Sequence, residues 1–145
     1  MRRIEARADD LERYTGIPQE RWFEKEFTVD EEYPGGSCTR TQTDQKGCVF
    51  LNKSGRGCLL HSFSIERNID YHDLKPMISC LFPLTYDDGV LVPAVEIDDR
   101  SLVCLDSGMT LYRGVRDEVL YYFGKGLVDE LDAIEQVVNV PQEST

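Results

Sequence analysis

The distribution of cysteines is the feature that most constrains this sequence. Four of the five lie in the stretch from Cys48 to Cys104, and Cys38 lies ten residues ahead of it. Each of the four, which include Cys58 and Cys80, stands beside an apolar run. Glycines and a proline interrupt the approaches to them, and such residues allow the backbone to bend sharply. We therefore expect these thiols to be brought inward together rather than scattered over the surface.

Length and charge limit the class of protein. The 145 residues are enough for one domain with a real core, so we predict a single domain over 1–145. A hydrophobic fraction of 41% and an aromatic fraction of 10% are typical of a globular protein. A protein with a net charge of −11 would be repelled by phosphate backbones and anionic lipids. We expect no nucleic acid and no membrane as partners, whereas a protein partner and the oligomeric state stay open.

The compartment follows from what the sequence lacks. No apolar run reaches the roughly 18 residues that span a bilayer, and the basic N-terminal residues are not followed by an apolar segment. We therefore expect a cytoplasmic, reducing environment. There, cysteines are more often metal ligands or reactive thiols than disulfides, and five thiols cannot all pair.

The pattern of apolar residues predicts an α+β fold. In it, a small irregular cysteine-bearing unit (38–104) with a β-hairpin packs against C-terminal helices (110–139). Asp-Gly at Asp88-Gly89 is a strong hairpin signal and predicts a positive φ for Gly89. Helical spacing and turn residues predict the other elements. They are helices over 9–14, 18–27, 58–67, 110–122 and 127–138, a strand over 94–97 that returns over 102–105, and a break between the last two helices at Gly124-Lys125-Gly126.

Thiolates that converge are suited to a tetrahedral zinc ion or an iron–sulfur cluster, and soft sulfur disfavours Mg²⁺ and Ca²⁺. None of the cysteine spacings is a Cys-x-x-Cys knuckle, so spacing alone does not choose between this interpretation and two others. In one of these the thiols are inert core residues, for which Cys104 between Val103 and Leu105 is the clearest case. In the other they form a redox disulfide. His61 follows Cys58 at ligand-like spacing, and a histidine that hydrogen-bonds within the fold is the alternative there.

Three short motifs carry a resemblance. They are Cys48-Val-Phe-Leu, Gly57-Cys58-x-x-His61 and Lys75-Pro76-x-x-x-Cys80-x-Phe82-Pro83. In this order they resemble the second half of the YkgJ-like CxxCxxCC cysteine-cluster proteins, which are described as a zinc- or iron-chelating domain and to which flagellin lysine methylases are related. The resemblance implies Cys48, Cys58 and Cys80 as ligands. Where the family has its CxxCxxCC run, this chain has only Cys38.

These observations predict a cytoplasmic cysteine-cluster protein that binds zinc or an iron–sulfur cluster in a structural role. The expected ligands are Cys48, Cys58 and Cys80, with Cys38, Cys104 or His61 completing the site. A redox or methylase-like enzyme with an iron–sulfur cluster is one alternative, and an acidic protein-interaction module with inert cysteines is another. The sequence contains no phosphate-binding loop and no dinucleotide fingerprint, and it assigns no catalytic residue.

Overall fold

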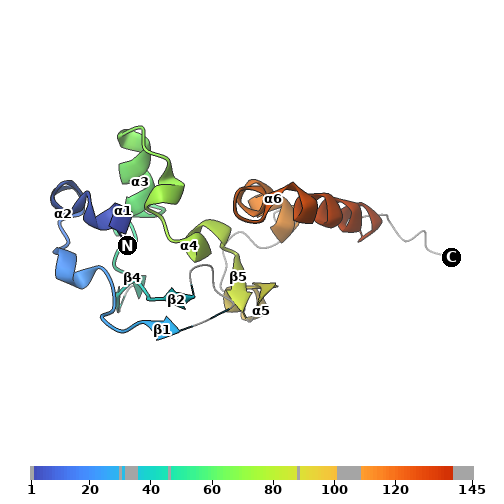
Figure 1. Cartoon of the computed structure of the whole chain (residues 1–145), viewed down its shortest axis with the longest axis horizontal. Coiled ribbons are helices and arrows are strands. Elements are labelled where there is room, and N and C mark those ends of the chain that lie inside the picture. The colour runs from blue at the N-terminus through green and yellow to red at the C-terminus, as the bar shows by residue number, and fades with distance from the viewer. Residues whose placement is uncertain are drawn as a thin grey trace. The chain divides into compact units, whose positions relative to one another are not determined.

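The computed structural model describes residues 2–29, 31, 36–45, 47–87, 89–100 and 109–138. It confirms the α+β class, with helices and three two-stranded antiparallel sheets (Figure 1). The chain divides into two compact units, Met1–Met77 and Ile78–Thr145. Within the described residues, no helix combines the length and the apolar character that crossing a membrane requires.

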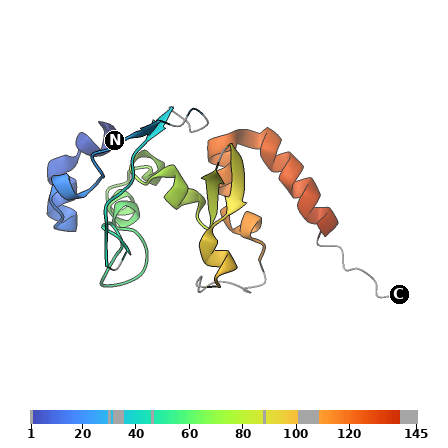
Figure 2. The same cartoon turned by 90° about the horizontal axis from the view of Figure 1, so that it is seen from below.

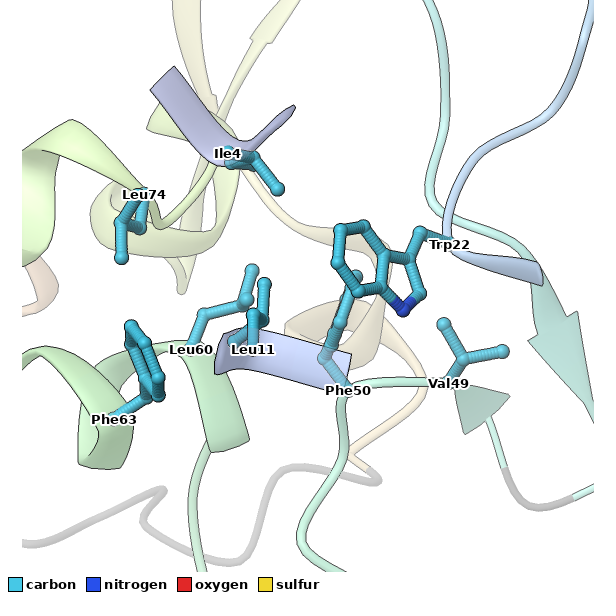
Figure 3. Close-up of a cluster of buried hydrophobic side chains, with 8 residues drawn as sticks. All are labelled: Ile4, Leu11, Trp22, Val49, Phe50, Leu60, Phe63 and Leu74. Atoms are coloured by element: carbon cyan, nitrogen blue, oxygen red, sulfur yellow. The ribbon is translucent and has the colours of Figure 1, made fainter. Parts of the chain in front are cut away.

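The first unit is a set of short elements around one apolar core. Eight side chains form this core, and Figure 3 shows the Trp22 and Phe50 rings beside each other, with Leu11 and Leu60 adjacent. The Trp22 and Phe50 ring centroids are 6.0 Å apart, and the indole N–H of Trp22 donates to the carbonyl of Ile17 at 2.8 Å. The elements are α1 (Arg2–Glu5), α2 (Ala8–Thr15), η1 (Gln19–Arg21), β1 (Thr28–Val29), β2 (Ser37–Cys38), β3 (Thr43–Asp44), β4 (Gly47–Cys48), α3 (Leu59–Glu66) and η2 (Tyr71–Asp73).

The predicted helix over 18–27 is wrong. Only η1 is helical there, as a single 3₁₀ turn, because the residues after it pair with a distant segment. The carbonyl of Trp22 accepts the backbone N–H of Gln42 at 3.0 Å, and the backbone N–H of Glu24 donates to the carbonyl of Arg40 at 2.8 Å. These bonds replace helical ones. They leave Trp22 in the core and Phe27 largely exposed, so the two aromatic residues do not share a face.

The helix predicted over 58–67 is confirmed as α3. It buries Leu60 and Phe63, as its apolar spacing requires. It ends before Asn68, whose φ of 55° is the left-handed conformation in which asparagine often terminates a helix. The predicted helix over 9–14 is also confirmed, as α2, which ends at Gly16 in the same conformation.

The second unit contains the predicted hairpin. Strands β5 (Leu84–Asp87) and β6 (Val90–Pro93) pair antiparallel, and Gly89 has a φ of 78°, as expected for a two-residue turn. Helix α4 (Met77–Leu81) precedes the hairpin. The strand expected over 94–97 is wrong, since Val95–Asp98 forms the short helix α5 with a backbone bond from Ile97 to Ala94 at its start. The return strand over 102–105 lies outside the described residues.

The two C-terminal helices are confirmed as the two halves of α6 (Leu111–Val138), which meet at Gly124. Gly124 has φ 83° and ψ 177°, a conformation that glycine tolerates far better than other residues, and Figure 2 shows the change of direction in α6. Side chains of the first half bind those of the second. Two nitrogens of the Arg116 guanidinium donate to the Asp132 carboxylate at 2.9 and 2.6 Å, and the Tyr112 hydroxyl donates to it at 2.8 Å.

Because of these contacts, the stability of α6 is expected to depend on pH. The hydrogen bonds from Arg116, followed by that from Tyr112, hold the pKa of the Asp132 carboxyl well below its usual range. The stabilisation is therefore fully present above the unfolded pKa of about 4 and is lost as the pH falls through the lower folded value. We expect Asp132→Asn to be less stable than the parent in thermal unfolding at pH 7, with the difference shrinking in strong acid.

The matched control is Asp129→Asn, in the same half of α6. Asp129 pairs with Lys125 one helical turn away, in an exposed ion pair, and such pairs contribute little. An equal loss of stability in the two variants at pH 7, or a difference between parent and Asp132→Asn that persists unchanged in acid, would contradict the role given to the Arg116–Asp132 pair.

Candidate metal centre

Cys48 and Cys58 are held on one small backbone framework in the first unit. The backbone N–H of Leu51 donates to the carbonyl of Cys48 at 2.9 Å, which closes a tight turn, and Leu51 then pairs antiparallel with Cys58. The ends of such a turn lie within about 7 Å, and paired residues lie about 4.5–5.5 Å apart between Cα atoms. The two cysteines are therefore within about 12 Å of each other between Cα atoms, although nine residues separate them in sequence.

Cys58 occupies a particular position, the N-cap of α3. Gly57 before it has a φ of 91°, which glycine adopts without strain, and the extended Cys58 then leads into the helix. The first helical N–H, that of Leu59, donates to the carbonyl of Phe50 at 2.8 Å and so ties the start of α3 to the turn after Cys48. The partial positive charge at a helix N-terminus favours a negatively charged sulfur.

Cys48 ends β4 and is half-buried. Its backbone pairs with that of Thr43, and its Sγ lies 3.3 Å from the hydroxyl oxygen of Thr41. In this reduced state the thiol donates to the hydroxyl, whereas a thiolate in its place would accept the hydroxyl hydrogen instead. Cys48 and Cys58 both pack against the apolar core of the first unit, which holds their backbone in place.

His61 lies on the first turn of α3, three residues after Cys58, so the two residues share one side of the helix. Its ring packs against the ring of Tyr71 on η2, with centroids 4.6 Å apart. Its Nδ1 atom is buried and has no hydrogen-bond partner within the part of the chain that is described. This nitrogen is a second kind of donor, on the first turn of the helix that Cys58 caps.

The other three cysteines have different settings. Cys38 is half-buried on β2, where it pairs with Thr28. Cys80 is buried on α4 of the second unit and hydrogen-bonds the hydroxyl of Tyr122 on α6; burial, followed by this bond, raises the pKa of Tyr122. Cys104 lies outside the described residues. None of the four described cysteines is in a disulfide with another.

Taken as they stand, the described residues do not form a closed coordination group. Among them, no three His, Cys, Asp or Glu side chains lie together closely enough to hold an ion. The donor types nevertheless fit a zinc or iron site, because thiol sulfur and imidazole nitrogen are what these metals bind in proteins. The orphaned Nδ1 of His61 is the structural sign that a partner of this kind fits here.

Three contacts made by the candidate ligands could not be predicted from the sequence. The contact between Thr41 and Cys48 can be anticipated only when the register of β3 and β4 is known, because that register pairs Thr43 with Cys48 and so brings Thr41 close to the thiol. Tyr71 against His61 and Tyr122 against Cys80 join separate elements. Such contacts follow from packing rather than from local pattern.

Compared with protein families, curated proteins and solved structures, the chain has no match. The function proposed next therefore depends on the residues of this chain and on the short motifs around its cysteines.

Proposed function

We propose that this protein binds zinc or an iron–sulfur cluster through thiolates of its cysteines, in the reducing cytosol, and that the metal has a structural role. Cys48 and Cys58 are the principal ligands in this proposal. Cys38, Cys80 and Cys104 are the other thiols that the sequence offers, and substitution of each in turn assigns the remaining positions.

The observation that carries the proposal is the framework that connects Cys48 with Cys58. The turn that begins at Cys48 ends at Leu51, and Leu51 pairs with Cys58. The backbone N–H of Leu59 donates to the carbonyl of Phe50 within the same turn. These backbone contacts connect two half-buried thiols. Core packing alone does not require two cysteines here, because a small apolar residue would fill either position. Thiolates near the start of α3 would also gain from the helix N-terminus.

A bound metal would supply cross-linking rather than catalysis. The first unit is made of two-residue strands and short helices, and elements of this size have little stability of their own. A metal held by Cys48 and Cys58 would fix the loop between them to α3. Binding free energy would then contribute directly to folding, as in other small metal-binding proteins.

Metal analysis of the whole chain, purified without oxygen, tests this proposal. We expect near one zinc ion or one iron–sulfur cluster per chain, measured as zinc, iron and acid-labile sulfide by elemental and colorimetric analysis. A brown protein indicates a cluster and a colourless protein indicates zinc. A freshly prepared protein that contains neither metal above trace, and that takes up neither after reduction and reconstitution, would contradict the proposed metal-binding function.

A further inference from the structure

The Nδ1 atom of His61 is the one buried side-chain nitrogen or oxygen in the described residues that lacks a hydrogen-bond partner. Such groups are rare in folded proteins, because a buried polar atom without a partner has lost its hydrogen bonds to water and gained none in return. Solvent does not reach this atom, and the ring is held against Tyr71 on its neighbouring element. A buried nitrogen of this kind needs a binding partner that the described residues do not supply.

The contrast with His72 supports this conclusion. His72 is the other histidine of the chain, and its ring also contacts Tyr71, with centroids 4.1 Å apart. Its Nδ1, however, lies 2.5 Å from a carboxylate oxygen of Asp70. The two histidines thus pack on the same tyrosine, but among the described residues only His72 has an acid beside its Nδ1. The missing partner is specific to His61 and does not come from packing on Tyr71.

We propose that His61 is a metal ligand through Nδ1 beside Cys58 and Cys48, and that the site takes a single zinc ion; this inference rests on the metal-binding function proposed above. Imidazole nitrogen combined with thiolate is a common donor set for structural zinc, whereas most iron–sulfur clusters are held by four thiolates. Residues 1–77 contain three cysteines, so a four-ligand site drawn from the first unit requires a donor other than sulfur.

Closing the site requires side-chain movement, because the described residues do not already form a group that holds an ion. Cys58 caps α3 and His61 lies on its first turn, so rotation of the two side chains can bring sulfur and nitrogen toward one point. Such movement would change the contact between His61 and Tyr71. We therefore expect zinc to alter the near-ultraviolet circular dichroism of the protein.

The test measures Zn²⁺ and Co²⁺ binding to the reduced full-length chain. The visible spectrum of bound Co²⁺ reports the number of thiolates and the geometry. His61→Phe keeps an aromatic ring against Tyr71 but has no nitrogen, and His61→Cys offers a thiolate instead. His72→Phe is the matched control, since it makes the same change in the other histidine.

We expect His61→Phe to lose zinc affinity by more than the roughly 10- to 100-fold that removal of an outer partner of a ligand costs. His61→Cys should recover binding, with a Co²⁺ spectrum shifted toward more sulfur, while His72→Phe should bind as the parent does. A parent that binds zinc and a His61→Phe variant that binds it equally would overturn the inference and leave the proposed function intact. A parent that carries an iron–sulfur cluster would do the same, and a parent that binds no metal would overturn both.

Discussion

Replacement of Cys58 by serine is expected to release the metal and to unfold much of the first unit. A structural zinc site contributes on the order of 10 kcal/mol to folding, and loss of a ligand forfeits much of it. If Cys58 were an inert core residue, the same change would cost only about 1–3 kcal/mol for a poorly satisfied hydroxyl. The two accounts therefore differ by several kcal/mol. Metal content and thermal unfolding of the purified variant distinguish them.

The remaining cysteines provide the controls. Cys48→Ser should behave as Cys58→Ser does. At least one of Cys38→Ser and Cys104→Ser should retain its metal, because a zinc ion needs only four ligands. Retention of normal metal binding by Cys48→Ser or Cys58→Ser would refute the proposed ligands, and so would an equal requirement for all five cysteines.

Phe50→Ala is expected to have the second largest effect, by removing the anchor of the loop that carries Cys48. The Phe50 ring is 1% exposed and packs with Trp22 and Phe23, whose ring centroids are 6.0 and 6.2 Å away. Truncation of a buried phenylalanine costs roughly 3–5 kcal/mol. Since the carbonyl of Phe50 also accepts the N–H of Leu59, the loop and the start of α3 should loosen together. We expect weaker zinc binding and a lower denaturant midpoint.

Phe27→Ala is the matched control for this prediction. Phe27 belongs to the same unit but is 56% exposed, and surface substitutions of this kind usually change stability by less than about 0.5 kcal/mol. If Phe50→Ala lost stability but bound zinc with the affinity of the parent, the loop from Cys48 to Cys58 would not be part of the site.

Elements with strong local signals were predictable from sequence. The Asp-Gly dipeptide that ends at Gly89 is specific to tight hairpin turns, so the hairpin was predictable. Helix α3 has apolar residues at helical spacing, a glycine before it and Asn68 after it. The break at Gly124 was also predictable from local sequence, because glycine adopts a positive φ that other residues rarely adopt.

Elements that depend on distant partners were not predictable. The segment after η1 has the composition of a helix, but its backbone bonds to residues 40–42 instead. Val95–Asp98 is only four residues long, and over so short a segment the apolar pattern does not distinguish a strand from the short helix that forms. In the candidate site, the cysteine motifs were visible in the sequence. The buried nitrogen of His61, which has no partner among the described residues, was not visible, because burial and pairing are properties of the fold.

X-ray absorption at the edge of the metal that the parent protein carries tests the central claim most directly, because it reports which atoms bind the metal. For zinc, we expect a shell of sulfur at about 2.3 Å together with nitrogen at about 2.0–2.1 Å. In His61→Cys, which is expected to keep the metal, the nitrogen shell should diminish and the sulfur shell should grow. A first shell of oxygen and nitrogen alone, with no sulfur, would contradict a thiolate metal site in this protein.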